Sequence, residues 1–239
     1  YNGVNNTVIG NYGELDTLHG FIYKDGTYTT LDFPGAIYTQ LDWINNSGSI
    51  VGRYLDSSGT QHGFIYKDST YTTLDYPVGL NTEAIWIANN GMIVGDYEDY
   101  SLHSGGYFIY EGGTYTPLNV PGAYETYPQW MGSSGVVTGG YDDDGLGPLG
   151  NFIYESGKYT TLKDLGIACT PREYATLIPF DSGGVVGWCD GRDYGFIYPG
   201  GTYSVLDFPG SFGTTPLAVS NSGAVVGIYV DSSHASHVF

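Results

Sequence analysis

The stretch HGFIYKDGTYTTLDFPG at residues 19–35 is the most informative part of the sequence, because the chain repeats it almost unchanged. The second copy, HGFIYKDSTYTTLDYPV, occupies residues 62–78 and starts 43 residues after the first. A regular period of this length indicates one small structural unit that the chain uses again and again.

Three columns of residues keep this register through the chain. A Phe recurs every 43 or 44 residues, at Phe21, Phe64, Phe108, Phe152, Phe196 and Phe239. A Tyr follows it at Tyr28, Tyr71, Tyr115, Tyr159 and Tyr203, and a Gly recurs at Gly10, Gly52, Gly95, Gly139, Gly187 and Gly227. The columns predict six repeats, the last of which ends at its Phe.

Each repeat is predicted to contain four short antiparallel strands and no helix. In the second repeat we expect strands at residues 39–45, 49–55, 62–66 and 70–76. The Asp-Gly between alternating aromatic and β-branched residues predicts a tight hairpin, and the Pro-Gly after the fourth strand ends the sheet.

A repeat of this length with four antiparallel strands is typical of a β-propeller blade, because one blade alone cannot bury both of its faces. Pro128 and Pro216 fall in the first strand of their repeats, which suits an innermost edge strand. We predict a single all-β domain over residues 1–239, a β-propeller of six four-stranded blades whose last blade lacks its outer strand. Five or seven blades are the alternatives.

The charge balance limits the partners of the protein. A net charge of −18, from 7 basic and 25 acidic residues, argues against binding to nucleic acid or to an anionic membrane surface. Solubility explains this charge, and a cation-binding surface is the alternative. No apolar run approaches the roughly 18–20 residues of a membrane span. The sequence shows no signal peptide, as expected of a mature or trimmed chain.

The motif HGFIYKDGTYTTLDFPGA, followed by INNSGSIVG, resembles the HAF-repeat proteins, bacterial extracellular proteins named for a His-Ala-Phe motif. Here the motif reads His-Gly-Phe at His19 and His62 and His-Val-Phe at His237, and the middle repeats depart from it. The resemblance covers essentially the whole chain. It implies a secreted or bacterial cell-surface protein and transfers no catalytic residue.

Two sets of loops are expected to hold a ligand, since propellers usually bind ligands where these loops meet one mouth of the channel. They join the fourth strand to the next first strand and the second strand to the third. Aromatic side chains there stand beside many carboxylates, a combination that suits sugar rings. The candidate ligand-binding residues are Tyr38, Trp43, Trp86, Tyr124, Tyr127, Trp130, Arg172, Glu173, Tyr174 and Phe212.

Packing between blades is the other role for these rings, and it is the interpretation that we favour for the Tyr and Phe residues as well as for the three Trp residues. Arg172 is one of only seven basic residues. It serves either a structural ion pair or the anchoring of a carboxylate or sulfate group.

Cys169 and Cys189 belong to the fifth repeat. Cys169 precedes its first strand and Cys189 ends its second, and the hairpin between them turns near residues 181–184. Because this pairing brings the two thiols within reach, the sequence predicts a disulfide that would hold the loop carrying Arg172 and Glu173.

Other motifs give weaker indications. Asp142 and Asp144 lie in an acidic loop that suits calcium, although the full twelve-residue calcium-binding pattern is missing, so a solvated loop is the alternative. No cofactor is required. His19, His62 and His237 share one repeat position and are predicted to be structural, bonding a neighbouring loop or turn.

These patterns favour a secreted or cell-surface binding module whose ligand is a glycan or another small molecule. One alternative is a polysaccharide lyase or glycoside hydrolase acting at the same channel mouth, where Arg172, Tyr127, Tyr174 and His103 offer suitable groups. The other is a structural surface or filament subunit that self-associates through the incomplete last blade. Neither nucleic-acid binding nor membrane insertion is expected.

Overall fold

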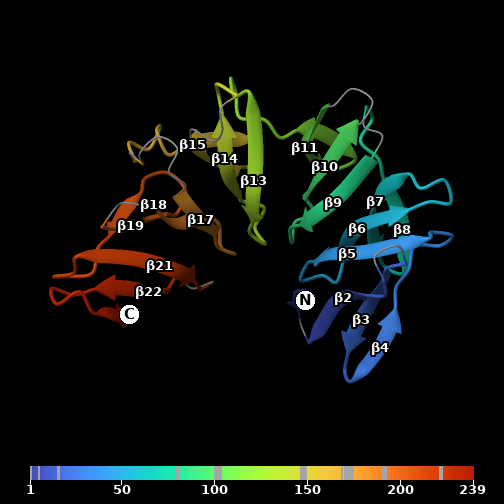
Figure 1. The fold of residues 1–239 in the computed structure, drawn as a ribbon, viewed down its shortest axis with the longest axis horizontal. Coiled ribbons are helices and arrows are strands. Elements are labelled where there is room, and N and C mark those ends of the chain that lie inside the picture. The colour runs from blue at the N-terminus through green and yellow to red at the C-terminus, as the bar shows by residue number, and fades with distance from the viewer. Residues whose placement is uncertain are drawn as a thin grey trace. The chain divides into compact units, whose positions relative to one another are not determined.

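The computed structural model describes residues 2–4, 6–14, 17–78, 81–99, 104–145, 150–167, 169, 175–189, 193–220 and 223–239. Within these residues the chain forms strands and turns and no helix, so none that could cross a membrane (Figure 1). The strands form six antiparallel sheets, numbered here sheet 1 to sheet 6 in chain order. Sheets 1 to 3 belong to one compact unit, Tyr1–Leu118, and sheets 4 to 6 to a second, Asn119–Phe239.

Unit 1 holds three complete four-stranded sheets, each ordered as in the sequence. Its strands are β1 (Asn2–Val4), β2 (Thr7–Tyr12), β3 (His19–Lys24) and β4 (Thr27–Thr30) in sheet 1; β5 (Tyr38–Ile44), β6 (Ile50–Leu55), β7 (Gln61–Lys67) and β8 (Thr70–Leu74) in sheet 2; and β9 (Asn81–Ile87), β10 (Ile93–Asp99), β11 (Ser104–Glu111) and β12 (Thr114–Pro117) in sheet 3.

Unit 2 holds two four-stranded sheets and one of three strands. Its strands are β13 (Glu125–Met131), β14 (Val137–Asp142), β15 (Gly150–Glu155) and β16 (Lys158–Thr161) in sheet 4; β17 (Ala175–Pro179), β18 (Val185–Cys189), β19 (Gly195–Tyr198) and β20 (Ser204–Leu206) in sheet 5; and β21 (Gly213–Val219), β22 (Val225–Val230) and β23 (Ser236–Val238) in sheet 6.

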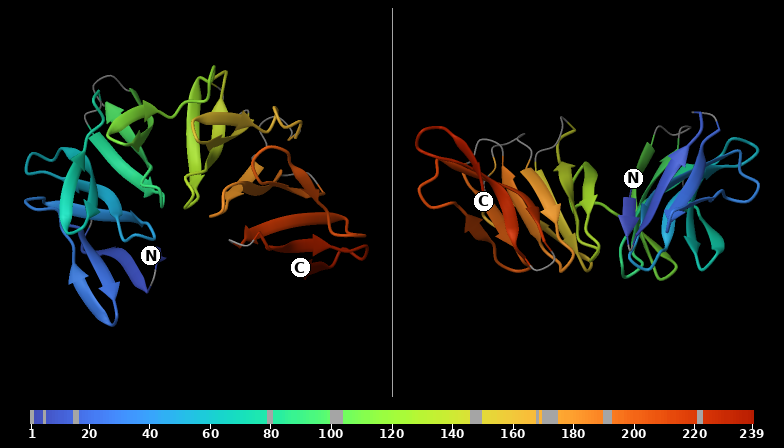
Figure 2. Two further views of the ribbon diagram at one scale, coloured as in Figure 1. Left: turned by 180° about the vertical axis from the view of Figure 1, so that it is seen from behind. Right: turned by 90° about the horizontal axis from the view of Figure 1, so that it is seen from below.

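The predicted four-stranded repeat is confirmed, as is the absence of an outer strand from sheet 6 among the described residues. Strands of one sheet lie side by side in both views of Figure 2. Pro128 and Pro216 lie in β13 and β21, which pair with only one neighbour each in the described part of the chain. The first strand is therefore an edge, and proline costs it no ladder hydrogen bond.

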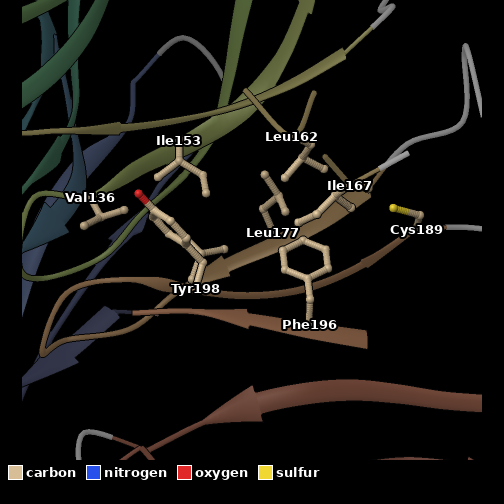
Figure 3. Packing of buried hydrophobic residues seen from close by; sticks show 10 residues of the cluster. Val136, Ile153, Leu162, Ile167, Leu177, Cys189, Phe196 and Tyr198 are labelled. Atoms are coloured by element: carbon tan, nitrogen blue, oxygen red, sulfur yellow. The ribbon is translucent and has the colours of Figure 1, made fainter. Parts of the chain in front are cut away.

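The hydrophobic core lies between neighbouring sheets. One cluster joins sheets 1 and 2, a second joins sheets 2 and 3, and a third joins sheets 4 and 5. In the third cluster Ile153 of β15 packs with Leu177 of β17 and Phe196 of β19 (Figure 3). Within each unit, a sheet thus buries apolar side chains against the sheet next to it in the chain.

The Phe and Gly columns meet inside each sheet. Phe64, Phe108, Phe152 and Phe196 are all fully buried. Next to Phe108, the column residue Gly95 has no room for a side chain, because a Cβ there would lie 2.2 Å from the carbonyl oxygen of Glu83. The first strand bulges beside this Gly column, with a register shift between Val94 and Gly95 in sheet 3. Glycine lets the bulged strand approach closely.

The Tyr column supports the outer hairpins. Each of its members in sheets 1 to 4 lies opposite the Tyr of the Phe-Ile-Tyr motif, with ring centroids 4.6 to 5.0 Å apart. These cross-strand pairs are Tyr23 with Tyr28, Tyr66 with Tyr71, Tyr110 with Tyr115, and Tyr154 with Tyr159. They account for the recurrence of Tyr in this position.

A hydrogen bond and a ring stack attach the linker between two sheets to the sheet that follows. The Thr39 hydroxyl accepts a bond of 3.0 Å from the Phe33 amide, and the Phe33 ring stacks on Tyr54 of β6 at 3.6 Å. The same two contacts recur at sheets 3 and 6. There the linker rings are Tyr76 and Phe208, the hydroxyls belong to Thr82 and Thr214, and the stacking partners are Tyr97 and Tyr229.

The disulfide takes the place of that stack in sheet 5. Cys169 and Cys189 are bonded, with Cα atoms 5.5 Å apart, as predicted. Cys189 lies opposite Ala175, just as Tyr54 lies opposite Thr39. Cys169 precedes Ala175 by six residues, the same spacing as between the linker ring of sheet 2 and Thr39. The bridge therefore joins the linker to the second strand at the two positions that hold aromatic rings in sheets 2, 3 and 6.

The Gly column gives a first prediction. Gly52→Ala should lower the free energy of unfolding by about 2–4 kcal/mol, because the new Cβ would lie 2.0 Å from the Gln40 carbonyl oxygen, which cannot move independently. Urea denaturation followed by tryptophan fluorescence measures the change. Ser57→Ala in an exposed turn is the control, and equal midpoints for the two variants would contradict the role of this Gly.

The disulfide gives a second prediction. The double change Cys169→Ala and Cys189→Ala should cost about 3 kcal/mol, since the bridge spans a sequence separation of 20 residues. The triple change Cys169→Phe, Cys189→Tyr and Ala175→Thr should recover at least half of this loss, because it rebuilds the linker contacts of the other sheets. Thermal denaturation compares both variants with the unaltered protein. An aromatic variant no more stable than the alanine variant would refute the equivalence.

Candidate functional site

The residue just before the first strand is held against the end of the second strand in three sheets. The amides of Ile37, Tyr124 and Phe212 donate to the carbonyl oxygens of Leu55, Asp142 and Val230, over 3.0, 2.6 and 2.7 Å. The backbone therefore presents these three side chains in the same way, at the same end of their sheets. In unit 2 the presented side chain is an aromatic ring both times.

These two rings are open to solvent. Tyr124 is 73% exposed and Phe212 is 57% exposed, whereas Phe152 and Phe196 of the Phe column are fully buried. Residues at the loop ends of a rigid scaffold often carry binding functions. We call Tyr124 and Phe212, with the turn that backs each, the loop-end platforms.

The turn between the second and third strands backs each platform. It contains a residue with positive φ, which is Gly59 in sheet 2, Gly145 in sheet 4 and His234 in sheet 6. The Tyr124 ring lies over Gly145, with its nearest atom 3.7 Å from the site of a Cβ there. The Phe212 ring stacks on the His234 imidazole, with centroids 5.5 Å apart and planes 23° apart.

The other predicted aromatic residues are placed differently. Trp43 packs against the core between sheets 2 and 3 and Trp86 is half-buried, but Trp130 is 55% exposed. The Tyr127 hydroxyl donates to Glu125. A ligand-binding role for these residues stays a prediction. Arg172, Glu173, Tyr174 and His103 lie outside the described residues.

A network of charged and polar side chains lies on the first two strands of sheets 2 and 3. Arg53 of β6 donates to Glu83 of β9 over 2.5 Å and to the side-chain oxygen of Gln40 over 3.0 Å. Gln40 in turn donates to Asp42 over 2.6 Å and accepts from the Tyr38 hydroxyl over 2.6 Å. Tyr38, a predicted site residue, thus lies at one end of a chain of hydrogen bonds that crosses to the next sheet.

Burial changes the acidity of the carboxyl groups in this network. It raises the pKa of Asp42 to about 7, with a further contribution from Glu83. It also raises the pKa of Asp96, which lies opposite Glu83 in the sheet, to about 7, with Glu83 and Glu98 adding to the shift. The pKa of Glu83 itself is raised by burial, against the attraction of Arg53. The Arg53 guanidinium bonds Glu83, and its charge also acts on Asp42 and Asp96, where it offsets only part of the rise in pKa.

The predicted metal-binding residues do lie together. One carboxylate oxygen from each of Asp142, Asp143 and Asp144 falls within 4.8 Å of the others. Asp142 Oδ1 also accepts the amides of Asp144 and Gly145, over 2.8 and 2.9 Å. Part of the ligand capacity of Asp142 therefore shapes the turn, and calcium binding stays a prediction.

The structural role predicted for the repeated His is confirmed. His19 and His62 bond Asp32 and Asp75 of the neighbouring outer segment, over 2.8 and 2.9 Å. His237 bonds a carboxylate of the preceding turn over 2.8 Å.

Sequence reasoning missed Arg53, Asp96 and His234. Arg53 and Asp96 follow the column Gly directly, where the other repeats have an uncharged residue, so a charge in that position was the available signal. The signal for His234 was the alignment of the turns DSSGT and DSSHA, where it replaces a Gly.

The raised pKa values give a prediction about pH. Unfolded Asp ionises near pH 4, whereas Asp42 and Asp96 in the folded protein hold their protons to about pH 7. The folded state binds more protons between these values, so its stability should fall as pH rises from 4 to 7. Asp96→Asn should stabilise the protein by about 1–2 kcal/mol at pH 8 and not at pH 4. Denaturant titrations at both pH values test this, with Glu111→Gln as the control for losing one exposed charge, and an equal effect of Asp96→Asn at both values would contradict it.

No protein-family model matches the chain, and no curated protein matches it in sequence. Solved structures do. The β-propeller domain of the Trilobed protease from Pyrococcus furiosus aligns with a TM-score of 0.53 and 10% identity, over 98% of this chain and 77% of that one.

Two further structures are similar. TolB from Acinetobacter baumannii aligns with a TM-score of 0.51 and 13% identity, over 86% of this chain and 55% of TolB. An acylaminoacyl peptidase in complex with Z-Gly-Gly-Phe-chloromethyl ketone aligns with a TM-score of 0.53 and 12% identity, over 95% of this chain and 42% of the peptidase. The chain thus spans about half the length of these two proteins. At such low identities the likeness shows the fold alone, and that fold is a β-propeller.

Proposed function

We propose that the protein is a carbohydrate-binding module that uses the loop-end platforms of its β-propeller. The observation that carries this proposal is the repeated presentation of an exposed ring, Tyr124 in sheet 4 and Phe212 in sheet 6, by one and the same backbone hydrogen bond. A flat ring that faces solvent offers a surface on which the C–H face of a sugar ring can stack.

Polar groups near the Tyr124 ring supply partners for sugar hydroxyls. Glu125, Asp143 and Asp144 are exposed next to Tyr124, and their carboxylates accept hydrogen bonds. A net charge of −18 disfavours uronic-acid polymers and favours neutral or amino sugars, because like charges repel.

The disulfide favours a location in which such a module would meet glycans. The Cys169–Cys189 bridge suits an oxidising environment. The repeat motif also resembles the HAF-repeat proteins, which are extracellular. We therefore propose that the module works outside the cell or on a bacterial surface.

One observation favours a second candidate, an enzyme that cleaves polysaccharide. Asp42 and Asp96 have pKa values of about 7, the range suited to proton transfer near neutral pH. The binding experiment below separates the two functions, because an enzyme releases product and a module does not.

Tyr124→Ala and Phe212→Ala should each weaken binding to a neutral oligosaccharide about tenfold, since each removes a stacking surface worth about 1–1.5 kcal/mol. A glycan array of neutral, amino and uronic-acid oligosaccharides finds the probe, and calorimetry measures the affinity. Tyr28→Ala is the matched control, because Tyr28 is 70% exposed on an outer hairpin. Loss of binding in this control, or no binding by the unaltered protein, would overturn the proposal. New reducing ends, lost in Asp96→Asn, would indicate the enzyme instead.

A further inference from the structure

Two turns of the protein are closed by the same set of hydrogen bonds. In sheet 2 the Asp56 carboxylate accepts the amides of Ser58 and Thr60, over 2.8 and 3.0 Å. In sheet 6 the Asp231 carboxylate accepts the amides of Ser233 and Ala235 over the same two distances. The two turns have the same hydrogen-bonded structure and can therefore be compared residue by residue.

The two turns differ at the residue with positive φ. Gly59 has φ of 82° and His234 has φ of 64°. A side chain is unfavourable in this left-handed region, and the turn in sheet 2 shows that Gly closes it with the same bonds. The other described non-Gly residues with positive φ are Asn6, Asp25, Asp68, Ser69 and Ser156, and they lie in shorter turns than the one that joins β22 to β23 and contains His234. The turn in sheet 2 is closed by the same bonds with Gly59, so closure of the turn does not require His at this position.

His234 also differs from the repeated His residues in its contacts. His19, His62 and His237 each bond an Asp carboxylate. Within the described part of the chain, neither ring nitrogen of His234 takes part in a hydrogen bond, and the side chain is exposed. Its ring contact there is the stack on Phe212.

The imidazole lies beside only one of the two platform rings, since the Tyr124 ring of sheet 4 lies over Gly145 instead. In sheet 2, where the turn has Gly59, the corresponding linker residue is the aliphatic Ile37. In sheet 6 an exposed aromatic ring and an exposed imidazole stack together and bury little surface, so the pair adds little to the core.

We infer that Phe212 and His234 form one sugar-binding subsite and that His234 determines its specificity. Phe212 provides the apolar surface for the sugar ring, and the imidazole nitrogens of His234 bond its hydroxyls. The subsite takes neutral sugars, whose hydroxyls can donate to or accept from the ring nitrogens of an imidazole. This inference rests on the proposed carbohydrate-binding function and assigns a residue that the platform at Tyr124 lacks.

The test compares stability with affinity in His234→Gly. Gly is the residue that the matched turn uses, so the melting temperature should stay the same or rise, while affinity for the bound saccharide falls at least fivefold. The probes are mannotetraose, cellotetraose and xylotetraose, all neutral. His234→Asn, which tolerates positive φ and keeps a donor and an acceptor, should retain more affinity than His234→Gly. In the unaltered protein, saccharide should shift the ¹⁵N signals of the His234 imidazole.

The possible outcomes separate this inference from the proposed function. A lower melting temperature with unchanged affinity in His234→Gly would show a structural role for His234 and overturn the inference. Binding that depends on Tyr124 but is unaffected by Phe212→Ala and His234→Gly would overturn the inference and leave the proposed function standing. If none of the three saccharides and no glycan on the array binds the unaltered protein, the proposed function itself fails.

Discussion

The whole structure depends on the burial of sheet faces against neighbouring sheets. A four-stranded sheet with apolar residues on both faces has no stable form alone in water, so the chain repeats the sheet and packs copies against one another within each unit. Phe64 and Phe108 are fully buried in successive sheets, so the same side chain fills the core at the same position of each repeat. The sequence repeats because every sheet has to meet this same packing requirement.

Packing of faces also requires that each sheet keep a fixed position against the sheet before it in the same unit. The linkers between sheets hold that position. The ring stack of Phe33 on Tyr54 and the bond to Thr39 attach a linker to the sheet that follows. The Cys169–Cys189 bridge performs the same task covalently. Two chemistries at one pair of positions show that the position of the contact matters more than its kind. Because the linkers are anchored by these inner contacts, the residues that follow them are free to face solvent.

The candidate site consists of residues that follow the linkers and face solvent. Backbone bonds hold Tyr124 and Phe212 in place, yet packing does not dictate their side chains, as Ile37 at the corresponding place shows. The Arg53 network illustrates the opposite case, in which charged groups occupy the region between two sheets and their acidity changes through burial. Exposed rings can bind a ligand without disturbing the core, whereas the network is coupled to the stability of unit 1.

Local turns and the regular period were enough to predict the strand order, the edge position of Pro128 and the pairing of Cys169 with Cys189. They also pointed to the exposed rings of the loop-end platforms as candidate residues. The folded chain was needed to show that Trp130 is exposed and that Arg53 reaches Glu83 of the next sheet. These features depend on contacts between different sheets, and a repeat pattern describes each sheet alone. The conformation of the turn residue His234 was equally hidden, since φ at one residue is set by the closure of the folded turn.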